Sequence, residues 1–153
     1  MDFSRITDSV YVGTTPQASD YRKLYDLGVR LIINMRFWWG QPANGDLPGL
    51  QYLRLRTFDS PLLPIPMRAL FQGANAALGV IGGGGRVLAH CSRGRHRSVA
   101  MAAAILIAQG HSAEDAMELI KKRRPQADPA ASHIRPRILE FARLWNNGQR
   151  SVY

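Results

Sequence analysis

The sequence predicts a single α/β domain in which a mostly parallel central sheet of about four to five strands is flanked by helices. Three observations support this prediction. Short apolar runs alternate with longer amphipathic segments along the chain. The 153 residues suffice for one domain with a sizeable core, but not for two. Finally, two apolar runs, at 86–89 and 99–108, enclose a short polar stretch, a pattern typical of a strand, a tight loop and a buried helix.

The first half of the chain is expected to contain three strands and two helices. The strands are expected at 10–12, 29–35 and 51–56, where the residues are β-branched or alternate between polar and apolar. One helix is expected from Ser19 to Leu27, because its apolar residues fall on one stripe and Gly28 follows as a stop signal. A second helix is expected to begin at Pro66, with an apolar stripe formed by Leu70, Phe71, Ala74, Ala77 and Leu78.

The second half is expected to contain one strand, at 86–89, followed by three helices. The first helix, 98–109, is apolar nearly all round, which is typical of a buried helix. The second, from Ser112 to Arg124, begins with a capping-box pattern and ends before Pro125. The last is expected at about 134–146, with apolar residues along one side.

The net charge of +9 predicts an anionic partner. Nucleic acid is not the expected one, because basic residues are spread along the chain and the run at 121–124 suits the end of a helix. A phosphorylated substrate explains the sign equally well. We expect no transmembrane segment, since the longest apolar run, 99–108, is far shorter than the ~20 residues of a span. The first residues contain no apolar signal core, so a cytoplasmic location is expected.

The chain contains one cysteine, Cys91, which excludes an internal disulfide. It also excludes reductases that need further cysteines to resolve an intermediate. No cluster of cysteine and histidine with the spacing of a metal site occurs in the sequence. We therefore expect neither a metal ion nor another cofactor.

The polar stretch around Cys91 has the chemistry of an anion-binding loop. Backbone N–H groups of a turn that opens into a helix point toward a common centre and favour an anion there. Gly94 allows a backbone conformation that other residues resist. The guanidinium of Arg97 can bind two phosphate oxygens side by side. The same positive field stabilises a thiolate, so we expect a lowered pKa and a nucleophilic Cys91.

These residues carry a resemblance to a known family. The stretch resembles the Cys-x5-Arg signature of cysteine-dependent phosphatases, in the form His-Cys-x-x-Gly-x-x-Arg-Ser. That form is similar to the dual-specificity branch of the protein tyrosine phosphatase superfamily. The resemblance covers nearly all of residues 1–153, which it implies to be one catalytic domain, and it is weakest at 37–49 and after Ala127. It places the loop between a central strand and a buried helix.

The resemblance implies a reaction and a set of roles. Cys91 would attack phosphorus and form a thiophosphate intermediate, while Arg97 would bind phosphate and stabilise the transferring group. Asp59 would protonate the leaving group and then activate water. His90 and Ser98 would support Cys91, the Ser98 hydroxyl easing departure of the thiolate. The residues expected to bind phosphate are Ser92, Arg93, Gly94, Arg95, His96 and Arg97.

The position of Asp59 also favours it as the acid on physical grounds. It follows the expected strand 51–56 at the carboxyl edge of the sheet, where ligands of α/β sheets bind. All three glutamates fall on expected helices beyond the loop. The alternative is that Asp59 is an ordinary turn residue. In that case Asp46 and Asp128 are the next candidates.

The substrate stays open at this stage. Proteins carrying phosphotyrosine, phosphoserine or phosphothreonine come first, with a phosphoinositide or an RNA 5′-phosphate as the alternative. Arg93, Arg95 and His96 would read extra phosphates in the second case, or else face solvent and tune Cys91. An anionic lipid partner is also open, because the aromatic run 37–39 either covers the core or forms an exposed rim. Two further classes are a non-catalytic phosphate-binding module and a rhodanese-like sulfurtransferase, although the latter would not require Asp59.

Overall fold

The structure of the protein, a computed structural model, describes residues 1–38 and 47–150. Within them, five strands form one sheet in the order β1-β2-β5-β3-β4. The strands are β1 (Phe3–Arg5), β2 (Val10–Gly13), β3 (Val29–Arg36), β4 (Gln51–Thr57) and β5 (Arg86–His90). All neighbouring pairs are parallel except β1 with β2. The predicted α/β domain with a mostly parallel sheet is therefore confirmed, and β1 is an antiparallel edge strand that the sequence pattern did not reveal.

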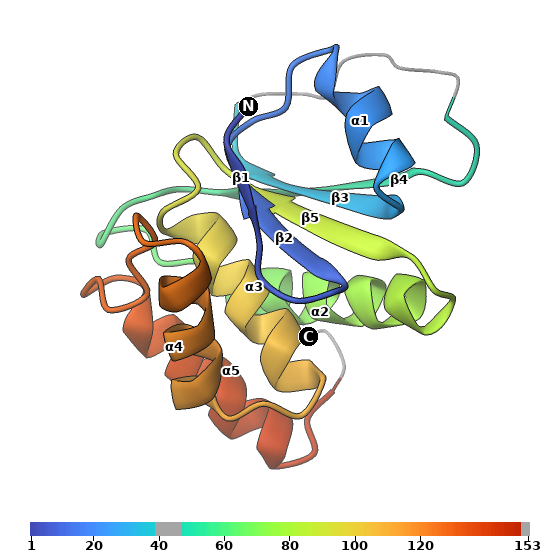
Figure 1. Ribbon diagram of the computed structural model, residues 1–153. Helices are drawn as coiled ribbons and strands as arrows, with labels where there is room; N and C mark the ends of the chain where they lie inside the picture. Colours follow the sequence, from blue (N-terminus) through green and yellow to red (C-terminus); the bar gives the residue numbers. More distant parts are fainter. Residues whose placement is uncertain (39–46, 151–153) are drawn as a thin grey trace.

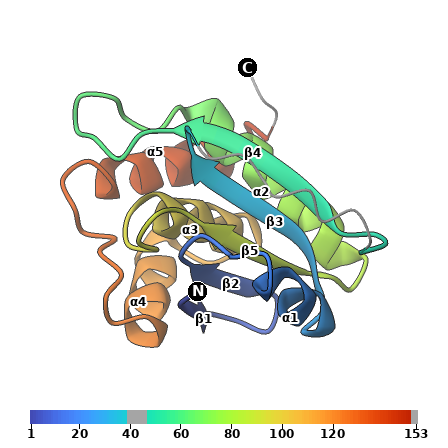
Figure 2. The ribbon, with the colours of Figure 1, turned by 90° about the horizontal axis from the view of Figure 1, so that it is seen from above.

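Helices cover both faces of this sheet unequally (Figure 1). The short α1 (Asp20–Asp26) packs on one face, where Tyr21 and Leu24 meet Tyr11, Ile32 and Leu88 of the strands. The opposite face carries the other four helices, which lie below the sheet in Figure 1, and in the view from above α2 passes behind β3 and β4 (Figure 2). They are α2 (Met67–Gly82), α3 (Arg97–Ala108), α4 (Ala113–Arg123) and α5 (Arg135–Asn146).

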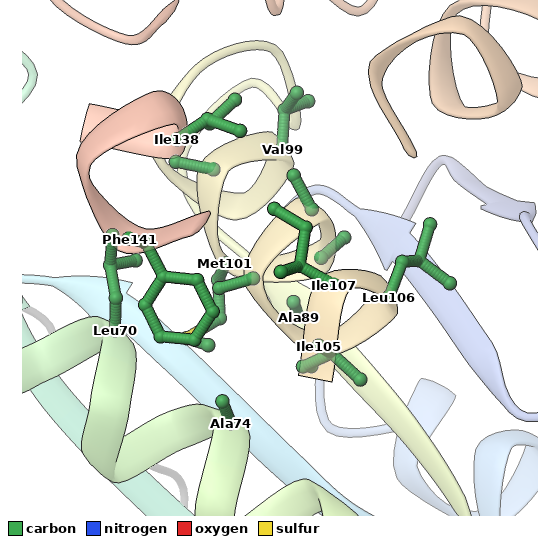
Figure 3. Packing of buried hydrophobic residues seen from close by; sticks show 14 of the residues in the cluster. Leu70, Ala74, Ala89, Val99, Met101, Ile105, Leu106, Ile107, Ile138 and Phe141 are labelled. Carbon is green, nitrogen blue, oxygen red and sulfur yellow. The ribbon is translucent and has the colours of Figure 1, made fainter. Parts of the chain in front are cut away.

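Helix α3 is the centre of the larger core. Its residues from Arg97 to Ile107 are all buried, which confirms the prediction from its apolar circumference. Leu70 and Ala74 of α2 and Ile138 and Phe141 of α5 lie around it (Figure 3). Because α3 is surrounded in this way, the position of its first turn is fixed by packing on several sides.

Parallel pairing brings the carboxyl ends of three strands to one edge of the sheet. At that edge β5 ends at His90, β3 at Arg36 and β4 at Thr57. The segments that follow are the Cys91 loop, the aromatic segment at Phe37 and the Asp59 segment. This is the edge where ligands of α/β sheets bind. In the described residues, no helix is long and apolar enough to cross a membrane.

Candidate active site

The loop between β5 and α3 turns sharply, and Gly94 makes the turn possible. Gly94 has φ +62, in the left-handed region that favours glycine. A Cβ at this position would lie 2.9 Å from the carbonyl of Gly13 and 2.5 Å from Nη2 of Arg124. Both the conformation and the space therefore require glycine here. The loop leads directly into α3, whose first residue is Arg97.

Cys91 lies at the start of this loop, almost fully buried. Its Sγ is 3.2 Å from the Oγ of Ser98, in the first turn of α3. Burial by itself raises the pKa of the Cys91 thiol. The Ser98 hydroxyl and backbone N–H, the charge of Arg97 and the backbone N–H of Gly94 outweigh burial, so the pKa lies below its ordinary value. The site thus favours a thiolate, as the sequence predicts.

Arg97 is held by the two neighbouring strands. Its Nη1 donates to the backbone carbonyls of Thr57, at 2.8 Å, and Met35, at 3.3 Å. Its Nη2 donates to the Ser92 hydroxyl at 3.2 Å. Within the described residues its buried Nε has no hydrogen-bond partner. Arg97 is therefore anchored to the strands through Nη1, and its Nε and the remaining N–H of Nη2 can bind an anion at the loop.

A second arginine supports the loop from below. Arg124 is fully buried, and its Nε donates to the Gly94 carbonyl at 2.7 Å. Its Nη1 donates to Ser4 at 3.1 Å and its Nη2 to Asp2 at 3.1 Å. The sequence run at 121–124 suggested only a helix end, and nothing in it indicates this contact. Lys121 does have that simpler role, donating to the Pro125 carbonyl at 2.6 Å.

His90 precedes Cys91 and is buried inside the sheet edge. Burial, and then the nearby charge of Arg36, lower the pKa of His90 to about 3, so the ring is neutral. Neither ring nitrogen has a hydrogen-bond partner among the described residues. His90 therefore contributes bulk beside Cys91 rather than charge.

Asp59 lies across the loop from Cys91, on the segment that follows β4. It lines a cleft of about 180 Å³ together with the loop residues Ser92 and Arg97. The side chain is about one-third exposed, and two imidazoles face it. His96 Nδ1 is 3.0 Å from Oδ2 and His133 Nε2 is 2.6 Å from Oδ1. Burial raises the pKa of Asp59, but hydrogen bonds from His96 and then His133 outweigh it, so the pKa is below the ordinary range.

His133 is the residue that sequence reasoning missed most completely. It precedes α5, far from the loop in sequence, and no motif includes it. Together with Asp59 and His96 it offers three ligand atoms within 4.8 Å of one another, a set that could hold a metal ion. The sequence shows no such cluster, because its members come from three separate segments.

Asp128, one of the two other candidates for the acid, does not line the cleft. Asp128 faces the outer side of the loop, with Oδ2 3.6 Å from His96 Nε2 and 3.9 Å from Arg95 Nη2. Asp46 lies outside the described residues. Arg93 and Arg95 are exposed. Of the two acidic candidates that the structure describes, Asp59 lines the cleft and Asp128 does not.

Aromatic side chains form the remaining wall of the cleft. Phe37 stacks on Phe58 with ring centroids 4.5 Å apart, and both line the cleft. Trp38 also lines it and is 77% exposed. Of the two interpretations of the aromatic run, these contacts favour the exposed rim. Trp39 lies outside the described residues.

Comparison with known proteins gives one consistent family. Residues 10–143 match the family described as dual specificity phosphatase, catalytic domain. Dual specificity phosphatase 28 of Mus musculus is 30% identical over 128 residues, covering 83% of this chain and 76% of the relative. Phosphatidylglycerophosphatase and protein-tyrosine phosphatase 1 of Rattus norvegicus is 36% identical over 148 residues, covering 91% of this chain and 73% of the relative.

Solved structures agree with these sequence matches. The crystal structure of human DUSP28 superposes with a TM-score of 0.83 at 26% identity, covering 94% of this chain and 95% of that one. The crystal structure of PTPMT1 in complex with PI(5)P superposes with a TM-score of 0.82 at 29% identity, covering 95% and 97% of the two chains.

The contacts of Cys91 lead to a prediction about its ionisation. The rate of alkylation of Cys91 by iodoacetamide, followed by mass spectrometry against pH, should have its midpoint below that of an ordinary thiol. Ser98→Ala should move the midpoint upward, because the hydroxyl favours the thiolate. Ser92→Ala is the matched control, since its hydroxyl contacts Arg97 instead. A midpoint that Ser98→Ala leaves unchanged would contradict this account of the thiolate.

Proposed function

The chain belongs to the dual specificity phosphatase family, and we propose that it hydrolyses phosphate monoesters through a covalent thiophosphate on Cys91. The observation that carries this proposal is the shared cleft. Arg97 and Ser92 of the loop and Asp59 line one cavity, and Cys91 lies at the base of the same loop. This arrangement supports the proposal, because a phosphate bound to the loop would have the nucleophile, the anion site and the acid around it.

In the first step the Cys91 sulfur bonds to phosphorus and the bond from phosphorus to the leaving oxygen breaks. Arg97 and the backbone N–H groups of the loop bind the non-bridging oxygens. Asp59 gives its proton to the leaving oxygen. His96 and His133 favour the ionised form of Asp59. A bound phosphate dianion has the opposite effect, because its negative charge favours the protonated form of the carboxyl group.

In the second step water attacks phosphorus and the bond between phosphorus and sulfur breaks. Asp59, now ionised, accepts a proton from the water. The Ser98 hydroxyl, 3.2 Å from Sγ, stabilises the departing thiolate. Inorganic phosphate and free enzyme result. No step calls on a metal ion or another cofactor.

Phosphorylated protein is the substrate class that we put first. The flat apolar wall formed by Phe37 and Phe58 suits the phenyl ring of phosphotyrosine, since stacked rings attract one another. The names of the relatives support the same class, because both include protein or dual specificity phosphatase activity. Phosphoserine and phosphothreonine use the same loop but gain less from this wall.

A second candidate is a phosphoinositide, or another phosphorylated lipid, in an anionic membrane. Large apolar side chains are exposed on two segments beside the cleft: Trp38 is 77% exposed, Leu62 is 88% exposed and Leu63 is 53% exposed. Such side chains can enter a lipid surface, and the net charge of +9 favours an anionic one. The relative captured with PI(5)P supports the same class.

The role of Asp59 has a specific kinetic consequence. Asp59→Asn should slow hydrolysis of phenyl phosphate by ~10²–10⁴-fold. It should slow an aryl ester with electron-withdrawing substituents much less, because its phenolate is a good leaving group and departs without a proton. Steady-state rates on both esters measure the difference. Asp26→Asn, a substitution on the surface of α1, serves as the control. An equal loss on the two esters would make Asp59 a turn residue and would remove the acid from this mechanism.

The exposed leucines Leu62 and Leu63 provide a test that distinguishes the two substrate classes. Leu62→Ser combined with Leu63→Ser should lower turnover of a phosphoinositide in anionic vesicles by about tenfold, since the contacts of these two exposed leucines with the lipid are lost. Turnover of a phosphotyrosine peptide should hardly change. Leu27→Ser is the matched control, because Leu27 is also exposed but precedes β3 at the opposite edge of the sheet. If the double leucine variant and the wild type hydrolyse the phosphoinositide in vesicles at equal rates, protein remains the favoured substrate class.

A further inference from the structure

The carboxylate of Asp59 is enclosed by two histidines that the phosphatase reaction does not require. His96 ends the Cys91 loop, and His133 precedes α5, so the three residues come from separate parts of the fold. His96 Nδ1 lies 3.0 Å from one carboxylate oxygen and His133 Nε2 lies 2.6 Å from the other. The two imidazole rings are 4.9 Å apart and nearly perpendicular. Each nitrogen therefore faces the space beside a different oxygen of the same carboxylate.

We propose that Asp59, His96 and His133 form a binding site for a divalent transition-metal ion of the zinc class. Two imidazole nitrogens and one carboxylate oxygen are a donor set that suits Zn²⁺. The three ligand atoms already lie within 4.8 Å of one another, so a metal at ~2.0–2.2 Å from each needs only small side-chain rotations. The ion replaces the protons that the histidine–carboxylate contacts would otherwise share.

A fourth residue supports this assignment independently. Asp128 Oδ2 lies 3.6 Å from Nε2 of His96, the nitrogen that does not face Asp59. A carboxylate on the far nitrogen of a metal-binding histidine fixes the orientation of the ring and raises its basicity. The backbone holds Asp128 in place, because its N–H donates to the Arg95 carbonyl at 3.0 Å. Asp128 is therefore placed beside the far nitrogen of His96, where it can accept a hydrogen bond once the ring turns toward the metal.

Access and charge are consistent with reversible binding. The side chains of Asp59, His96 and His133 are 36%, 20% and 16% exposed, so an ion can enter from solvent. Asp59 and Asp128 supply two negative charges around the site. Arg95, whose Nη2 is 3.9 Å from Asp128, opposes them in part. With three protein ligands, the metal keeps open positions for water.

Occupation of the site has a consequence for catalysis that rests on the proposed function. A carboxylate bound to a metal cannot carry the proton that the leaving group needs. Cys91 and Arg97 do not belong to the site, so attack on phosphorus remains possible. The ion should therefore inhibit hydrolysis of phenyl phosphate strongly and that of an activated aryl ester weakly.

Metal binding can be measured without activity in the Cys91→Ser variant, which removes the sulfur as a competing ligand. Titration with Co²⁺ should give visible absorption bands of a cobalt–histidine site, and Zn²⁺ should displace the Co²⁺ and raise the melting temperature. Adding His133→Gln or Asp59→Asn should abolish the bands. Adding Asp128→Asn should weaken binding by ~10–100-fold. Adding His111→Gln, which changes an exposed histidine on another turn, should leave binding unchanged. Melting temperatures measured without metal show whether each variant is folded.

The possible outcomes separate the metal site from the proposed function. The site is overturned if Co²⁺ fails to bind the Cys91→Ser protein, or if binding survives His133→Gln in a folded variant. It is supported if the bands depend on His133 and Asp59 but not on His111. If Co²⁺ binds in this way and yet slows both esters of the wild-type enzyme equally, the metal site stands and the acid role of Asp59 fails.

Discussion

The hydrogen bond from Arg124 to the carbonyl of Gly94 is the contact on which the active-site loop depends. A buried guanidinium is costly unless its donors are satisfied, and Arg124 meets this condition through the loop carbonyl, Ser4 of β1 and the Asp2 carboxylate. Nη2 of the same guanidinium leaves no room for a Cβ at residue 94. The sharp turn of the loop, the glycine and the buried arginine therefore require one another. Edge strand β1, which supplies Ser4 beside the preceding Asp2, is part of the support for the loop.

The two buried arginines, Arg124 and Arg97, have different roles at the loop. Arg124 binds the outside of the turn and Arg97 binds the inside, where it is anchored to the ends of β3 and β4. The positive charge of Arg97 and the Ser98 hydroxyl lower the pKa of Cys91 against the effect of burial. A loop that stabilises a thiolate is also a loop that binds a phosphate dianion, because both need the same inward-facing donors.

Much of this arrangement could be predicted from the sequence, because it is local. The strand, loop and helix around Cys91 are contiguous, and their pattern of apolar and polar residues predicted the elements to within a few residues. Asp59 could be placed because parallel strands end at a common edge. His133 and Arg124 could not be placed, because each reaches the loop through tertiary packing and belongs to no motif. β1 was missed because Phe3–Arg5 is too short to show an alternating pattern.

The central claim is that phosphate passes through a covalent bond to Cys91, and mass spectrometry after rapid quenching tests it most directly. Asp59→Asn should slow the attack of water, so its reaction with an activated aryl phosphate should accumulate the intermediate. We predict one added phosphate on the peptide that contains Cys91, located on the sulfur, and none after Cys91→Ser. A phosphorylated His96 or His133 instead, or substantial turnover by the Cys91→Ser enzyme, would contradict the account.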